Sequence, residues 1–391
     1  MTQARPLKIA YLCDQDPEDS HSYSGGNSRI LAALRAHVGN VTVLSSGWHA
    51  AQPVRRVIEA LPDSFTIRAR WRAQLAMARV IARGTEAELA SAQHDVVFCA
   101  YSFQSLAKLR LPATMLRAFT SDATPTIYKK SEVGSAFGSY VQLSRLIDPL
   151  IERCERQVLR QCDVIFWPSK WMQTEAGHRY DLAPERSLVV PWGANIADPG
   201  PPNDVPLQQG EPVRLLMLGR DWWGKGGPIA FETMQRLRDG GHDATLCVIG
   251  CTPPQEHCNE HVKVLGHLDK SEPAENAVMQ ATLREAHFLI MPSHESYGFA
   301  FCEASAYGLP SLCLDVGGIP VRDAVNGQAL PAGSGPSDFA ACIAQYINAP
   351  ADYASLRKAT RQEYETRLNW QSWGEAVRIE LLRARDGAPR I

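Results

Sequence analysis

Residues 288–303, FLIMPSHESYGFAFCE, decide the fold class of this chain. They open with the short apolar run Phe288–Met291, which is typical of a strand buried on both faces of a sheet. After Gly298 the pattern predicts a helix that runs through residues 304–306. A buried strand, a glycine turn and a helix form the repeating unit of a parallel α/β sheet.

The same rhythm of short β-rich runs and longer helical patterns extends along the whole chain. Helical periodicity is clear at Asn27–Ala36 and Leu146–Gln161. The expected strands are Lys8–Leu12, Val41–Leu44, Asp95–Cys99, Ala113–Phe119, Asp163–Trp167, Arg214–Leu218, Ala244–Ile249, Val262–Leu265, Phe288–Met291, Ser311–Leu314 and Gln328–Leu330. With 391 residues, the chain suits two α/β domains of Rossmann-like type, each with a parallel sheet covered on both faces.

The boundary between the two domains is expected near a proline-rich stretch. Residues 197–212, ADPGPPNDVPLQQGEP, hold five prolines and little apolar material, which is typical of a stiff linker. We expect an N-terminal domain over 1–192 and a C-terminal domain over 193–372. Two such domains on a hinge imply a cleft, and ligands of these sheets bind outside the carboxyl ends of the strands.

Overall charge and the N-terminus restrict the class of partner. The chain has 40 basic and 42 acidic residues, a formal net charge of −2, so no nucleic-acid partner is expected. Met1–Ala10 lacks the apolar segment of a signal peptide, and no run of about 18 apolar residues occurs. We therefore expect a cytoplasmic protein.

The ten cysteines are scattered, and several lie in apolar strand-like runs, which predicts buried, reduced thiols. One cluster invites a metal interpretation, and it consists of Cys247, Cys251, His257, Cys258 and His261. Its spacing is looser than that of paired zinc ligands, and the first cysteine looks like a strand residue. No metal site is expected.

Arg55–Arg83 carries seven arginines and few acids. The plainer interpretation is a solvated helical face, and the sharper one is a patch for an anionic acceptor or a lipid head group. The second interpretation predicts peripheral contact with the inner face of a membrane.

The paired acids Glu295 and Glu303 flank the glycine turn. Gly298 lets the backbone turn closely, so the amides of Phe299 and Ala300 lie at a helix N-terminus, which suits a diphosphate. One carboxylate then faces a sugar and the other a ribose, because each accepts two hydroxyl hydrogen bonds. The alternative for Glu303 alone is an acid in the first helical turn that complements the helix dipole.

A second constellation is the glycine-rich loop Leu218–Gly227, which follows the first strand of the C-terminal half. Arg220 and Lys225 stand on it, next to Gly219, where both cations converge on one anion. By itself such a pair is common on surface loops. Trp222 and Trp223 in the same loop, like Trp192, fit either sugar stacking or core packing.

A third constellation, Ser24–Ser28, opens a helix after the first strand. Gly25 and Gly26 allow a distal phosphate or a sugar hydroxyl to approach the backbone closely. The spacing does not match the dinucleotide-binding Gly-x-Gly-x-x-Gly pattern. An ordinary capped helix start is the alternative.

These motifs together resemble the retaining, GT-B-fold glycosyltransferases of family 4, also called glycosyl transferases group 1. The similarity is specific over residues 213–331 and looser over 1–190. The matching motifs are Glu295-x7-Glu303, Gly308-Leu-Pro310, Gly317-Gly318-Ile319-Pro320, Gly219-Arg220 with Lys225-Gly226, Pro191-Trp-Gly193-Ala-Asn195, and Trp370 with Trp373.

The resemblance implies a GT-B architecture in which a final helix, 373–391, packs back on the N-terminal domain. It implies that Arg220 and Lys225 stabilise the departing nucleotide diphosphate, in place of a metal ion or other cofactor. Glu295 is then the sugar-binding acid and Glu303 the ribose-binding acid. His267 lies where the family places the base.

One position departs from the family, whose members often carry a histidine near the donor sugar. Here the mid-domain strand leads into Phe119–Thr124, which contains no histidine. Asp122 is the substitute candidate, and a turn or helix-capping role is the alternative.

The resemblance predicts transfer of a sugar from a UDP-, GDP-, ADP- or TDP-linked donor to an unidentified glycan, lipid-linked or small-molecule acceptor. Retention then needs no protein nucleophile, and no metal takes part. The alternatives from other classes are a GT-B phosphorylase or synthase and a nucleotide-sugar-binding pseudoenzyme.

Overall fold

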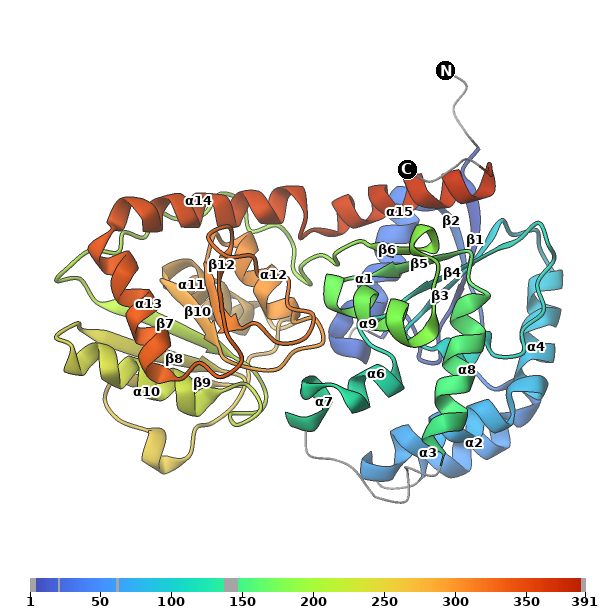
Figure 1. Ribbon diagram of the computed structural model, residues 1–391, viewed down its shortest axis with the longest axis horizontal. Helices are drawn as coiled ribbons and strands as arrows, with labels where there is room; N and C mark the ends of the chain where they lie inside the picture. The colour runs from blue at the N-terminus through green and yellow to red at the C-terminus, as the bar shows by residue number, and fades with distance from the viewer. Residues whose placement is uncertain (1–4, 20–21, 61–62, 137–146, 388–391) are drawn as a thin grey trace. The chain divides into compact units, whose positions relative to one another are not determined.

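The computed structural model describes residues 5–19, 22–60, 63–136 and 147–387, which form two compact units (Figure 1). Unit 1 consists of Met1–Lys130, Ser139–Pro191 and Trp370–Ile391. Unit 2 consists of Ser131–Gly138 and Trp192–Asn369. Each unit is built around its own six-stranded sheet.

The sheet of unit 1 is parallel, with strand order β2-β1-β3-β4-β5-β6. Its strands are β1 (Leu7–Leu12), β2 (Gly39–Val43), β3 (Val96–Ala100), β4 (Leu116–Thr120), β5 (Val164–Trp167) and β6 (Ser187–Val189). The five strands predicted in this half are confirmed. The prediction was wrong at residues 113–115, which form a turn before β4, and it missed β6, whose three residues give almost no periodic signal.

Helices cover both faces of this sheet (Figure 1). They are α1 (Gly26–Ala33), α2 (Gln52–Glu59), α3 (Asp63–Ala76), α4 (Ala78–Ala90), α5 (Phe103–Leu106), α6 (Pro125–Lys130), α8 (Asp148–Arg160), α9 (Lys170–Tyr180) and α15 (Trp370–Arg385), with the short turns η1 (Ser22–Gly25), η2 (Leu34–Val38), η3 (His49–Ala51) and η5 (Pro184–Arg186). The apolar residues of α4, α5, α8 and α9 pack on one face. On the other face, α15 contacts α1 and β5, and Trp373 meets Phe98 edge to face at 6.1 Å between ring centroids.

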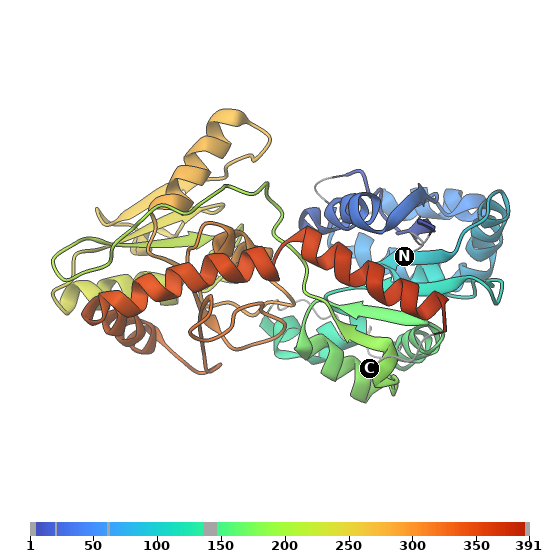
Figure 2. The ribbon, with the colours of Figure 1, turned by 90° about the horizontal axis from the view of Figure 1, so that it is seen from above.

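The sheet of unit 2 is also parallel, with strand order β12-β11-β10-β7-β8-β9. Its strands are β7 (Val213–Leu218), β8 (Ala244–Ile249), β9 (Val262–Gly266), β10 (Phe288–Met291), β11 (Ser311–Leu314) and β12 (Gly327–Leu330). Its helices are α7 (Glu132–Ala136), α10 (Gly227–Asp239), α11 (Pro273–Glu285), α12 (Phe299–Ala306), α13 (Pro336–Asn348) and α14 (Pro350–Thr366), with the turn η6 (Gln255–His257). All six predicted strands are confirmed. Figure 2 shows the ribbon of this unit from above, with α14 running along it.

The proline-rich stretch 197–212 is part of unit 2 and does not form a free hinge. Side chains of α11 and of the segment before β10 hold its backbone. Arg284 donates to the Pro199 carbonyl oxygen at 2.6 Å, and ring Nε2 of His287 lies 3.0 Å from the Pro206 carbonyl oxygen. The prolines therefore stiffen a segment of this unit.

The arginine-rich stretch Arg55–Arg83 is not a uniform solvated face, and that interpretation was wrong for two of its arginines. Arg55 and Arg70 are buried. The first donates to the Ser46 carbonyl oxygen, and the second places Nη2 3.3 Å from a carboxylate oxygen of Asp14. Among the described residues, no helix is both long and apolar enough to cross a membrane.

Candidate functional site

Two loops of unit 2 meet at one edge of its sheet. One follows β7 and carries Gly219–Gly226, and the other follows β10 and carries Pro292–Gly298. Because β7 and β10 are neighbouring parallel strands, both loops leave the sheet at the carboxyl edge, where ligands of such sheets bind.

Glu295 and Lys225 form an ion pair across these two loops. The Ser293 hydroxyl also donates to Oε1 of Glu295, at 2.7 Å. The carboxylate is therefore fixed by a cation and a hydroxyl. The sequence predicted both members of the pair, whereas the role of Ser293 had no signal beyond its place two residues before the acid.

The backbone of Glu295 is fixed by the glycine pair that follows β11. Gly318 N–H donates to the Glu295 carbonyl oxygen at 2.9 Å. Gly317 adopts φ 75°, and a Cβ there would collide with the same carbonyl group. Only glycine meets both demands at position 317 at little cost. The Gly-Gly-Ile-Pro motif thus supports the acid.

Gly298 begins α12 in a left-handed conformation, with φ 87°. No side chain caps this helix, and its first amides lie at the predicted diphosphate position. The ring of Phe299 stacks on that of Trp192 at 5.7 Å between centroids, and Trp192 is fully buried. Core packing is therefore the role of Trp192.

Glu303 is the fifth residue of α12, and the first turn of that helix holds no acid. The helix-dipole interpretation for this acid was therefore wrong. Its carboxylate is nearly buried and pairs with Nζ of Lys270, 2.7 Å away. Lys270 lies in the loop after β9 and was missed from the sequence, because only the fold brings it to Glu303.

The remaining residues of the loop after β7 divide into exposed and buried ones. Arg220 is exposed, and Gly219 lies against the side chain of Lys225. Trp222 is buried and donates from Nε1 to Nδ1 of His257 at 3.1 Å, whereas Trp223 is 64% exposed. Trp222 is thus a packing residue, and Trp223 keeps the stacking interpretation.

The cysteine and histidine cluster noted in the sequence does not gather around a common point. Cys247 is a residue of β8, as predicted, and His257 packs among aromatic rings. In the part of the chain that the structure describes, no three His, Cys, Asp or Glu side chains are placed to hold a metal ion. Each of the ten cysteines is a free thiol.

The other three predicted site residues lie in unit 1. Gly25 and Gly26 stand at the start of α1, after β1, and Gly25 adopts φ 81°. The capped-start alternative was wrong in its detail, because no side chain caps this helix. Asp122 is partly buried in the loop after β4. Burial raises the pKa of Tyr101, and the charge of Asp122 raises it further.

A buried polar cluster in unit 1 was missed altogether. Asp14, directly after β1, accepts from the Tyr23 hydroxyl at 2.8 Å, from Arg70 Nη2 at 3.3 Å and from Gln104 Nε2 at 3.4 Å. Burial raises the pKa of Tyr23, and the neighbouring carboxylate raises it further. These residues come from four separate segments, so no local pattern links them.

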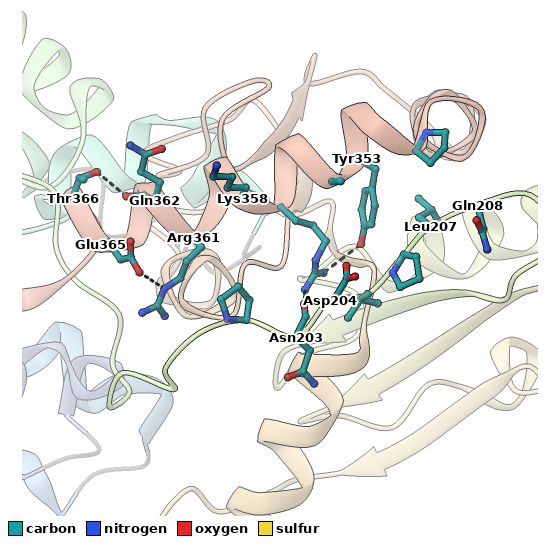
Figure 3. A pocket seen from close by; sticks show the side chains of 16 residues that line it. Asn203, Asp204, Leu207, Gln208, Tyr353, Lys358, Arg361, Gln362, Glu365 and Thr366 are labelled. Atoms are coloured by element: carbon teal, nitrogen blue, oxygen red, sulfur yellow. Dashed lines mark hydrogen bonds and ion pairs between the residues drawn. The ribbon is translucent and has the colours of Figure 1, made fainter.

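A large groove in unit 2 contains none of the predicted residues. It measures about 780 Å³ and runs between the proline-rich stretch 197–212 and α14 (Figure 3). Its arginines serve the scaffold. Arg361 donates to the Ala306 carbonyl oxygen and pairs with Glu365, and Arg357 bonds the Asn203 carbonyl oxygen at 3.4 Å. Size alone therefore does not make this groove the functional site.

Comparison with known sequences finds similar proteins mainly for the C-terminal half of the chain. Residues 212–349 match the profile of the family described as glycosyl transferases group 1. A D-inositol 3-phosphate glycosyltransferase from Corynebacterium glutamicum is 28% identical over 186 residues, which are 43% of this chain and 44% of that protein. A glycogen synthase from Mycobacterium tuberculosis is 29% identical over 189 residues, 45% of this chain and 44% of that protein. The match thus spans less than half of either relative.

Solved structures show the fold of the whole chain. The lipopolysaccharide outer core galactosyltransferase WaaB, in its apo form, superposes with a TM-score of 0.65 at 14% identity, over 97% of this chain and 99% of that one. A sucrose-phosphate synthase from Thermosynechococcus elongatus gives 0.62 at 17% identity, over 98% and 100%. The predicted GT-B architecture of two Rossmann-like domains is confirmed.

Proposed function

We propose that this protein is a retaining glycosyltransferase that moves a sugar from a nucleotide-diphosphate donor to an acceptor hydroxyl without a metal ion. One observation carries the proposal. The loops after β7 and β10 bring Lys225 to Glu295, and α12 begins directly after the second loop. That edge offers cations and helix amides for a diphosphate, with a carboxylate for sugar hydroxyls.

In this proposal the charge that develops on the leaving diphosphate is stabilised by Arg220, Lys225 and the amides of Phe299 and Ala300. The bond from the anomeric carbon to the diphosphate oxygen breaks while the acceptor oxygen bonds the same face. The acceptor proton passes to the leaving phosphate. Glu295 holds donor hydroxyls, and its contact with Lys225 links sugar binding to the phosphate clamp.

The residues of unit 1 complete the proposal. Gly25 and Gly26 present backbone for a distal phosphate or a sugar hydroxyl, and Asp122 bonds a donor hydroxyl or orients the acceptor. The curated relatives include a transferase whose name specifies D-inositol 3-phosphate and a glycogen synthase. A hydroxyl of a polyol or a sugar is therefore the acceptor chemistry we propose.

The experiment that tests the function compares Lys225→Ala and Glu295→Ala with Lys263→Ala. Lys263 is exposed on β9 and serves as the control. We expect turnover or donor hydrolysis to fall by about a hundredfold or more for each loop variant, because each removes a group that acts on the departing diphosphate or the sugar. Near-normal activity in both variants would contradict the assignment.

Metal independence is tested separately with EDTA. We expect activity with a UDP-, GDP-, ADP- or TDP-sugar to be unchanged after chelation. A thermal-shift series with the four nucleoside diphosphates identifies the base, since a ligand of the native state raises the melting temperature. Activity that disappears with EDTA and returns with Mg²⁺ would overturn the metal-free mechanism.

We also propose that the reaction takes place in the cytoplasm, with peripheral contact to the inner membrane face through the Arg55–Arg83 region. Within this region α2 exposes Val57, at 69%, beside the exposed Arg56. An amphipathic basic helix of this kind suits an anionic lipid surface. Flotation with anionic vesicles at low and high salt tests this membrane contact. If the protein shows no salt-sensitive binding to the vesicles, the proposed contact is wrong.

A further inference from the structure

The second acid of the pair depends on a residue outside every motif of the sequence. Glu303 has a side chain only 9% exposed, and Nζ of Lys270 lies 2.7 Å from its Oε1. Lys270 itself is 45% exposed, in the loop between β9 and α11. A half-exposed lysine thus reaches a nearly buried carboxylate.

This contact differs from that of the first acid. Glu295 is held by Lys225 and by Ser293. For the side chain of Glu303, Lys270 is the one hydrogen-bond partner among the described residues. A nearly buried carboxylate is costly without a partner, so the orientation of Glu303 rests on this single lysine.

The contact leaves one oxygen of Glu303 for a ligand. Lys270 occupies Oε1, whereas a carboxylate has two oxygens and about four acceptor positions. We propose that Lys270 is a positioning residue that holds the Glu303 carboxylate turned to accept the two hydroxyls of a ribose. The inference rests on the proposed function and on the ribose-binding role that the resemblance implies for Glu303, and it adds Lys270 as the residue that orients this acid.

The expected loss of nucleotide binding follows from the kind of hydrogen bond that Lys270 makes. A hydrogen bond that involves a charged group contributes more than a neutral one, and the partial exposure of Lys270 reduces this through solvent screening. Loss of the lysine is therefore expected to weaken binding of a ribonucleotide about tenfold. A nucleotide without the two hydroxyls gains nothing from Glu303 and is expected to change less than twofold.

The experiment measures binding of UDP, GDP and ADP, each beside its 2′,3′-dideoxy analogue, by calorimetry. The variants are Lys270→Met, which keeps the length of the side chain but not its charge, and Lys270→Arg, which keeps the charge. Lys263→Met on β9 is the matched control. Lys270→Met is expected to remove the preference for the ribose form, and the arginine and control variants to keep it.

A double variant separates positioning from general damage. In the background Glu303→Gln, the change Lys270→Met is expected to add no further loss, because the lysine acts through the carboxylate. Equal weakening of both nucleotide forms, or unchanged discrimination in Lys270→Met, would overturn the inference. A wild-type protein that binds none of the three nucleotides would instead overturn the proposed function itself.

Discussion

The carboxyl edges of the two sheets carry polar groups in different ways. In unit 2, Glu295 and Glu303 are each paired with a lysine that keeps part of its surface in solvent. In unit 1, Asp14 is buried with Arg70, and both are almost inaccessible. In unit 2, a ligand can replace the lysine as the partner of each acid, because the lysine is easily hydrated, and the fold loses little stability. In unit 1, the charge pair is part of the core.

Removing the buried acid is expected to have the largest effect on stability. Asp14→Ala leaves Arg70 as an uncompensated buried charge and removes an acceptor from the Tyr23 hydroxyl. We expect unit 1 to lose about 3–5 kcal/mol of unfolding free energy. Urea unfolding, with hydrogen exchange followed separately in the two units, measures the loss and shows which unit suffers it.

The matched change in unit 2 is Glu303→Ala, whose partner Lys270 returns to water. We expect this variant to lose about 1 kcal/mol or less, since a half-exposed lysine is easily hydrated. Equal losses from Asp14→Ala and Glu303→Ala would remove the distinction between a structural and a functional charge pair.

The comparison also explains what the sequence could predict. The sequence predicts eleven strands because each is a short apolar run. It also predicts the two acids of 288–303, because both lie in one short segment. Lys270 and Asp14 could not be placed, because their partners are distant in the chain and meet only through the fold. Arg55 and Arg70 were misjudged for the same reason, since a charged residue in a helical pattern gives no sign of a buried partner.

The two units are expected to respond to pH in opposite directions. Burial raises the pKa of Glu155, on α8 of unit 1, to about 7. Burial, together with the charge of Arg214, lowers the pKa of His287, in unit 2, to about 4. Glu155 therefore contributes stability that is full below pH 4.5 and is lost as pH rises through 7. His287 contributes stability that is full above pH 6.5 and is lost as pH falls through 4.

Each of these two effects has an upper limit of about 3 kcal/mol, from a difference of about 2.5 pKa units between the folded and unfolded states. Urea titrations between pH 4.5 and 7.5 test them with Glu155→Gln and His287→Gln. We expect the stability of Glu155→Gln relative to the wild type to increase as pH rises. We expect the stability of His287→Gln relative to the wild type to increase as pH falls. Parallel pH curves for wild type and variants would contradict the opposite roles of the two groups.

The last change concerns Gly317, and it tests whether the edge of unit 2 is built for binding. Gly317→Ala forces a side chain into φ 75° and against the Glu295 carbonyl group. We expect a loss of about 1–3 kcal/mol, because the residue is strained and its neighbour must shift. Gly333→Ala is the control, since that position is exposed with open space around it, and its change is expected within about 0.5 kcal/mol.

The informative quantity for Gly317→Ala is nucleotide affinity. A shift of the Glu295 backbone turns its carboxylate away from Lys225, so Gly317→Ala should lose affinity for a sugar nucleotide more than for the nucleoside diphosphate alone. Equal loss for both ligands would mean that the glycine supports the whole edge rather than the acid that faces the sugar.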